Sequence, residues 1–174
     1  THEGEEEQVL DAHAEVRRRF PDALLVLVPR HPPRFDAIRQ LLERRGVAHA
    51  LRSRGEAANP ATEVVLGDTM GELMDFYAAA DVAFVAGSLV PVGGHNLLEP
   101  ASLGVPILTG PYNFNAEDVF AKLEEAGAVR RVPSGGALGA ATAALLADRA
   151  ARDRMGARGR EVLQANRGAV ARLL

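Results

Sequence analysis

The sequence is defined first by what it lacks. Its 174 residues include no cysteine and no tryptophan, and only one of its 20 basic residues is a lysine. Without cysteine there is no disulfide framework and no thiol chemistry, which fits a reducing compartment. A formal net charge of −3 argues against a nucleic-acid binder. The residues are 47% hydrophobic and 25% charged, so we expect one soluble globular domain or lobe.

Signatures of several enzyme classes are also missing. No Gly-x-Gly-x-x-Gly follows the first predicted strand and no Gly-x-x-x-x-Gly-Lys-Ser/Thr occurs, which argues against redox dinucleotides and ATP hydrolysis. The five histidines lack metal-ligand spacing, and the serines lack a nucleophile-elbow context. We therefore expect no metal, no cofactor and no complete catalytic set. No apolar run approaches the length of a membrane span, and Thr1 stands where a start methionine would, so we expect a piece of a longer protein.

Short apolar runs alternate with amphipathic segments along the whole chain. An acidic start at Glu5 and arginines at residues 17–19 suit the two ends of a first helix, through its dipole. The alternation predicts an α/β fold with a Rossmann-like, doubly wound parallel sheet in a three-layer α/β/α arrangement, its first strand central and its last at an edge. The predicted strands are residues 23–28, 47–51, 63–66, 82–86, 105–109 and 128–132.

The stretch from Ser88 to Pro100 links a buried strand to a helix start through a glycine-rich turn. Gly93 and Gly94 can adopt positive φ and let the backbone approach a ligand. Asn96 fits the N-cap of the helix. Glu99, one turn later, fits equally well as a capping-box partner of Asn96 or as the acceptor of two ribose hydroxyls.

Two further loops leave the same edge of the predicted sheet. Arg30 and His31 follow the first strand between prolines, and residues 67–73 follow the third, where Asp68 or Thr69 fits a helix cap. Taken alone, Arg30 is more readily explained as a solvated side chain in a proline-stiffened turn than as a ligand contact. Convergence of three loops at one edge favours a binding site. Asn115 is expected to cap the helix over residues 116–126.

Four blocks of residues resemble the carboxyl-terminal lobe of the bacterial Kdo (3-deoxy-D-manno-octulosonic acid) transferases. They are Pro29-Arg30-His31-Pro32, Gly67-Asp68-Thr69-Met70-Gly71-Glu72-Leu73, Gly94-His95-Asn96 through Glu99-Pro100-Ala101, and Gly110-Pro111 with Phe114-Asn115. The opening Thr1-His2-Glu3-Gly4-Glu5-Glu6 is similar to the family's Ser-Thr-His-x-Gly-Glu-Glu segment at the hinge into this lobe. The blocks keep the family's order, and the terminal helices match only in type.

The resemblance implies a glycosyltransferase of the two-lobed GT-B architecture, inverting, that adds Kdo from CMP-Kdo to a lipid A precursor in lipopolysaccharide biosynthesis. Residues 1–174 would be the donor-binding lobe, and the amino-terminal acceptor lobe is outside this chain. The implied nucleotide contacts are Pro29, Arg30, Met70, Gly71, Glu72, Asn96, Leu97, Leu98 and Glu99. Supporting positions are His31, Ser88, Gly93, Gly94 and His95.

The family's general base is a glutamate of the amino-terminal lobe, so we assign no catalytic residue and expect this chain alone to be inactive. The resemblance places the whole protein at the cytoplasmic face of the Gram-negative inner membrane, with membrane and lipid A contacts through the absent lobe. Pro33, Leu97 and Tyr112-Asn113 depart from the usual family residues. Two alternatives stay open: a GT-B lobe of a UDP-sugar transferase or epimerase, and a non-catalytic nucleotide-binding module.

Overall fold

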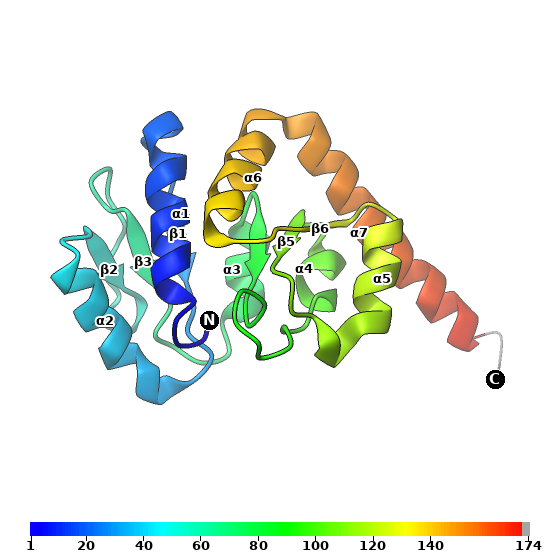
Figure 1. Ribbon diagram of the computed structural model, residues 1–174, viewed down its shortest axis with the longest axis horizontal. Coiled ribbons are helices and arrows are strands. Elements are labelled where there is room, and N and C mark those ends of the chain that lie inside the picture. The colour runs from blue at the N-terminus through cyan, green and yellow to red at the C-terminus, as the bar shows by residue number, and fades with distance from the viewer. Residues whose placement is uncertain (172–174) are drawn as a thin grey trace.

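A computed structural model of the chain describes residues 1–171. In this range two three-stranded parallel sheets lie side by side, and helices flank them (Figure 1). The first sheet has the order β1-β3-β2 and the second the order β4-β5-β6. The strands are β1 (Leu25–Leu27), β2 (His49–Leu51), β3 (Val64–Leu66), β4 (Ala83–Val85), β5 (Ile107–Thr109) and β6 (Val129–Arg131).

One helix precedes β1, and two follow β6 at the end of the chain. Four others connect successive strands, whereas β2 and β3 are joined by a 3-10 turn and a loop. Three short 3-10 turns, at Pro32–Arg34, Arg52–Arg54 and Phe114–Ala116, lie in the connections. The helices are α1 (Glu6–Arg19), α2 (Phe35–Arg44), α3 (Leu73–Ala79), α4 (Leu98–Leu103), α5 (Glu117–Glu125), α6 (Gly135–Ala147) and α7 (Arg149–Ala171). No helix of the described range is long and apolar enough to cross a membrane.

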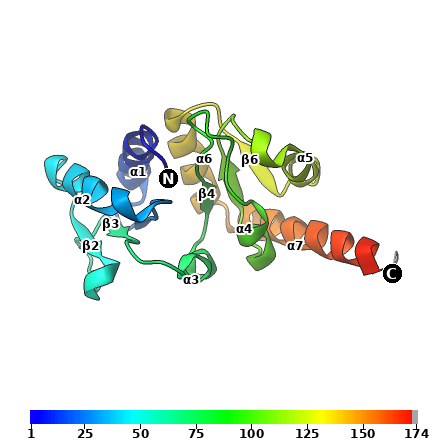
Figure 2. The same cartoon turned by 90° about the horizontal axis from the view of Figure 1, so that it is seen from below.

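A shared core joins the two halves. Buried side chains of the first sheet, such as Leu27 and Leu66, belong to the same cluster as Leu108 of β5 and Leu138 of α6. Helices α1 and α6 pack against each other on one side of the strands, where the two halves meet (Figures 1 and 2). Their backbones approach closely, because a Cβ on Gly139 would lie 3.0 Å from the carbonyl oxygen of Ala12. The two sheets therefore form one lobe.

The predicted fold class is confirmed, but the strands form two ladders in place of one sheet, and the prediction of a central first strand is wrong. Strand β1 ends its own hydrogen-bonded ladder, although it lies next to the second half of the molecule (Figure 1). Thr1 hydrogen-bonds to the backbone just after β1. Its nitrogen donates to the Val28 oxygen at 2.8 Å, and Arg30 N donates to the Thr1 oxygen at 3.2 Å. Strand β6 lies at an edge, as predicted.

The predicted helix caps at Asp68, Thr69 and Asn115 are wrong. Helix α3 begins after Glu72 and α5 after Ala116, and neither helix has a side-chain cap. The polar side chains tie loops together instead. Both carboxylate oxygens of Asp68 accept from Ser53, at 2.8 Å from its backbone nitrogen and 2.5 Å from its hydroxyl.

Asn115 serves a loop contact of the same kind. Its side-chain amide donates to the Val92 oxygen at 3.0 Å, and its backbone N–H donates to the Gly93 oxygen at 3.0 Å. The predicted N-cap role of Asn96 is partly right. Its Oδ1 accepts from the backbone N–H of Leu98 at 3.0 Å, but the cap position of α4 is Leu97. Side chains that could cap a helix are thus used to join neighbouring loops.

Candidate functional site

The predicted ligand loops gather at the carboxyl ends of the strands. In Figure 1 the N-terminus and the loop after β4 lie close together on the lower side, and Figure 2 views the molecule from that side. The loops after β1, β3 and β4 meet this edge, as does the loop from Gly110 to Ala116 that follows β5. This edge is the ligand-binding position of open parallel sheets.

The loop after β4 is closed and tightly packed. Gly94 N donates to the Gly87 oxygen at 2.7 Å, and both residues have positive φ, 78° and 73°. Gly93 has φ 105°, and a Cβ there would come within 2.5 Å of the Phe114 ring and the Asn115 side chain. The glycines therefore let two protein loops pack against each other, in addition to any approach to a ligand.

Ser88 is part of that packing and not of the exposed surface. Its hydroxyl donates to the Val85 oxygen at 2.7 Å and accepts from Gly110 N at 2.8 Å, and the residue is fully buried. The side chain of Leu97 is also buried, in the core with Val85 and Ile107. The hydroxyl of Ser88 is therefore occupied by protein partners, and Leu97 can contact a ligand only through its backbone.

A carboxylate from the start of α1 holds the same loop, and the sequence interpretation missed it. Glu5 is fully buried, and its two oxygens accept backbone N–H groups of Gly87 at 2.8 Å, Ser88 at 3.1 Å and Leu89 at 3.0 Å. The backbone N–H of His2 adds a fourth contact at 3.3 Å. Consecutive N–H groups in such a turn form a nest for an anion. Here the protein's own carboxylate fills it.

Glu6 is buried as well, which corrects the interpretation of both residues as helix-dipole charges. Its carboxylate accepts from the Thr1 hydroxyl at 3.0 Å and pairs with Arg34 at 3.2 Å. The only sequence signal for these roles was the Thr-His-x-Gly-Glu-Glu block, since acidic residues in a first helical turn are ordinarily solvated. The first six residues are thus built into the candidate site.

Three imidazoles and one guanidinium lie together on the exposed side of this segment. The Nε2 atoms of His2 and His95 are 2.9 Å apart, and their rings stack with centroids 4.8 Å apart. His31 meets His2 edge-on at 5.6 Å. Burial, followed by the charges of the Thr1 ammonium, His2 and Arg30, lowers the pKa of His95 to about 4. Among the described residues, no group of three or more side chains is arranged to hold a metal ion.

These neutral histidines predict a stability that depends on pH. Burial lowers the pKa values of His2, His13 and His95 below their ordinary 6.5. The unfolded chain then binds more protons than the folded one, so the stability is present above pH 6.5 and is lost as the pH falls below it. We expect Tm to drop between pH 7.5 and pH 5 in scanning calorimetry, and His95→Gln to flatten part of that slope. A Tm that stays constant across this window, or an equal effect of His49→Gln, would contradict the assignment.

The loop after β3 presents an exposed corner before α3. Met70 is 69% exposed, and Gly71 has φ 86° with open space around it. The Glu72 carboxylate accepts from the Thr69 hydroxyl and pairs with Arg52 at 2.6 Å, and these two contacts lower its pKa. Glu72 is therefore held in place, while the backbone of Met70 and Gly71 stays accessible.

Glu99 is accessible and uncommitted. In the part of the chain that the structure describes, its carboxylate has no hydrogen bond or ion pair, so the capping box with Asn96 does not form. Burial and then the nearby Glu99 charge raise the pKa of Tyr77 to about 12, which places this carboxylate next to α3. Asn96, Leu98 and Glu99 line a groove of about 450 Å³.

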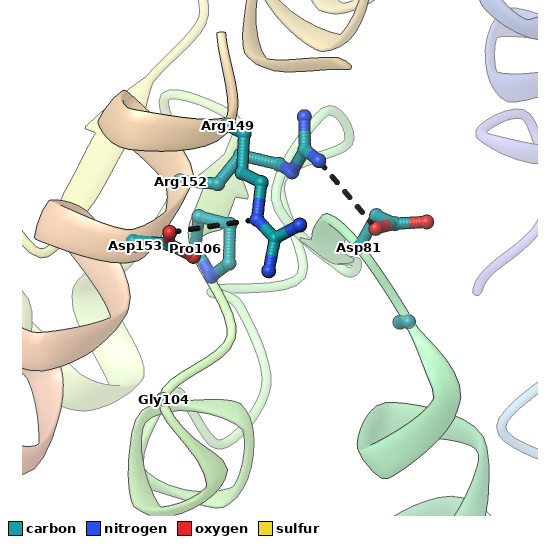
Figure 3. A pocket seen from close by; sticks show the side chains of 7 residues that line it. Asp81, Gly104, Pro106, Arg149, Arg152 and Asp153 are labelled. Atoms are coloured by element: carbon teal, nitrogen blue, oxygen red, sulfur yellow. Dashed lines mark ion pairs between the residues drawn. The ribbon is translucent and has the colours of Figure 1, made fainter.

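A second hollow lies at the other ends of the strands, next to the residues that precede β4 and β5. Figure 3 shows Asp81 facing Arg152, with N–O 3.8 Å, and Arg149 paired with Asp153 at 3.7 Å. The hollow has a volume of about 370 Å³. None of the predicted site residues lines it.

Known proteins are similar to this chain over most or all of its length. The family described as "Glycosyl transferases group 1" matches residues 5–162. A 3-deoxy-D-manno-octulosonic acid transferase of Haemophilus influenzae is 46% identical over all of this chain, and one of Bordetella pertussis is 39% identical. The alignments cover 41% and 42% of those proteins, so the chain spans about two fifths of their length.

A solved structure is similar over nearly the whole lobe. The C-terminal CMP-Kdo binding domain of WaaA from Acinetobacter baumannii superposes with a TM-score of 0.90 at 36% identity. The match covers 94% of this chain and 86% of that domain. The fold expected from the sequence is thus found in a domain that has its own crystal structure.

Proposed function

Because this chain belongs to the group 1 glycosyl transferases, we propose that it is the donor-binding lobe of a 3-deoxy-D-manno-octulosonic acid transferase and that it binds CMP-Kdo. The similarity to two Kdo transferases over the whole chain supports this proposal, as does the similarity to a CMP-Kdo binding domain. The whole protein would transfer Kdo to a lipid A precursor at the cytoplasmic face of the inner membrane.

One structural observation carries the proposal most directly. Arg30 and Glu99 have no side-chain hydrogen bond or ion pair in the described range, although Arg34 and Glu72 nearby are both paired. A free guanidinium matches a phosphate or carboxylate, and a free carboxylate matches two vicinal hydroxyls. The accessible backbone of Met70 and Gly71, between these two groups along the chain, fits the edge of a cytosine base.

The chemistry of inverting sugar transfer determines which steps the residues of this lobe can assist. Inverting transfer displaces CMP while a base removes a proton from an acceptor hydroxyl. We place that base outside this chain, as the family resemblance implies. The residues of this lobe hold the nucleotide and stabilise the charge that builds on the departing phosphate, chiefly through Arg30. This chain alone is therefore expected to bind CMP and to transfer nothing.

A competition experiment separates this proposal from a UDP-sugar lobe. Calorimetric titration of the chain should give a measurable affinity for CMP and a weaker one for UDP. Preference for UDP would favour the UDP-sugar transferase or epimerase alternative, and absence of binding to either nucleotide would contradict the proposal. Transfer activity by residues 1–174 alone would overturn the assignment of the base to another lobe.

Removal of Arg30 or Glu99 tests the two contacts separately. We expect Arg30→Ala and Glu99→Gln each to weaken CMP binding by at least about tenfold, since a hydrogen bond to a charged group is worth about 1.5–3 kcal/mol. Arg54→Ala is the matched control, because Arg54 is an exposed arginine of a neighbouring loop with a partner of its own, Glu56, at 3.8 Å. Unchanged CMP affinity in both variants would favour a lobe whose exposed charges are merely solvated.

A further inference from the structure

The stacked pair of His2 and His95 has room for only one proton between its rings. With the two Nε2 atoms 2.9 Å apart, one nitrogen donates and the other accepts. Two imidazolium rings would bring two N–H groups face to face. The pair therefore has two accessible states: two neutral rings, or one imidazolium hydrogen-bonded to one neutral imidazole.

The charged groups around the pair leave its exposed side basic. His31 faces it from the loop after β1, and the charge of Arg30 from the same loop also acts on it. From α1 and the residues before it come Glu5 and Glu6, and both carboxylates are buried and already bound. Arg34 pairs with Glu6 and with Glu3 at 3.3 Å. The two carboxylates that act on the pair, Glu5 and Glu6, are thus both already bound within the protein.

We propose that the His2–His95 pair is a proton-accepting contact for the phosphate of the donor nucleotide, and that it takes up one proton when a phosphate dianion binds beside Arg30. This inference rests on the proposed function. It adds His2 and His95 to the phosphate contacts and assigns the pair a single positive charge when CMP is bound. The proton comes from solvent and ends on a ring nitrogen, so the pair changes from neutral to singly positive. Burial and neighbouring charges keep the rings neutral at pH 7 without the ligand, as the lowered pKa values of both show.

Proton uptake gives the pair a preference for the leaving group over the substrate. A sugar nucleotide such as CMP-Kdo carries one negative charge on its phosphodiester, whereas released CMP carries close to two above pH 6. A positive charge that develops with the second negative charge binds the departing phosphate more strongly than the bound donor. Interactions that grow toward the products in this way lower the barrier, because they are stronger in the transition state than in the ground state.

Histidine ring titrations by NMR test the proposal directly, with CMP and cytidine as the probes. With saturating CMP, we expect the shared titration of His2 and His95 to move from below pH 7 to above it, because the adjacent negative charge favours the protonated pair. Cytidine, which lacks the phosphate, should leave it unchanged. His13 and His49 serve as internal controls, since they hydrogen-bond to backbone oxygens of Glu63 and Val47.

The outcomes separate this inference from the proposed function. If CMP shifts the backbone amides of the loops after β3 and β4 but leaves the ring titrations unchanged, the inference is wrong and the nucleotide site stands. If CMP shifts no amides at this edge, the proposed function itself fails. His2→Gln should weaken CMP binding at pH 7 by up to about tenfold, because the charged pair cannot form, and should leave cytidine binding unchanged. His49→Gln should change neither, and equal weakening for both ligands would assign His2 a structural role only.

Discussion

Glu5→Ala is expected to destabilise the lobe more than any other single change of a charged residue. The substitution removes the acceptor of three consecutive N–H groups, those of Gly87, Ser88 and Leu89. A buried donor without a partner costs about 1–3 kcal/mol, so we expect the free energy of unfolding to fall by about 3 kcal/mol or more. Since small domains are stable by about 5–15 kcal/mol, this is a large fraction of the total. Urea denaturation measures it.

Two further variants show whether the carboxylate itself is required. Glu5→Gln keeps the size of the side chain but offers one acceptor oxygen and an NH₂ group that faces other donors, so it should recover only part of the loss. Glu7→Ala, an exposed glutamate two residues away, should change stability little. Equal effects of Glu5→Ala and Glu7→Ala would contradict the structural role of the buried nest.

Gly110→Ala is expected to separate the two loops that frame the site. A Cβ at this position would overlap the carbonyl group of Ser88 and lie 2.6 Å from Leu89 N. Both are backbone atoms and cannot swing aside, so the loops must move. Overpacking of this kind typically costs about 1–3 kcal/mol. Because Ser88 and Leu89 belong to the loop that leads to Asn96 and Glu99, we also expect CMP binding to be lost.

Gly136→Ala is the matched control for this substitution. Gly136 lies in α6, and the nearest atom to a Cβ there is Ser134 Oγ at 4.0 Å. Alanine should fit without strain and stabilise the helix by up to about 1 kcal/mol. A Gly110→Ala protein with unchanged Tm and unchanged CMP affinity would show that the two loops are not tightly packed against each other.

The fold could be predicted well because its signals are local. Continuous apolar runs bounded by proline, glycine or charge place every strand, and six strands alternating with helices admit few parallel arrangements. The prediction that the loops after Val28, Leu66 and Ala86 share an edge followed from that topology alone. The strands are shorter than predicted because only three residues of each predicted run form the ladders.

The site was predicted less completely because its supports act over long sequence distances. Glu5 accepts hydrogen bonds from Gly87, Ser88 and Leu89, which are more than 80 positions away in the sequence. Nothing in an acidic helix start indicates such partners. Asp68 and Asn115 have the right chemistry for caps, but their partners, Ser53 and Val92, lie on other loops. Pairwise contacts of this kind appear only once the loops are placed together. The nucleotide contacts themselves remain predictions.

A crystal structure of the chain with CMP bound tests the central claim most directly. The account predicts CMP at the carboxyl edge, with its phosphate beside Arg30 and His95, its base against the backbone of Gly71, and its ribose hydroxyls on Glu99. CMP bound instead in the hollow between Asp81 and Arg152 (Figure 3), or anywhere that leaves these residues untouched, would contradict it.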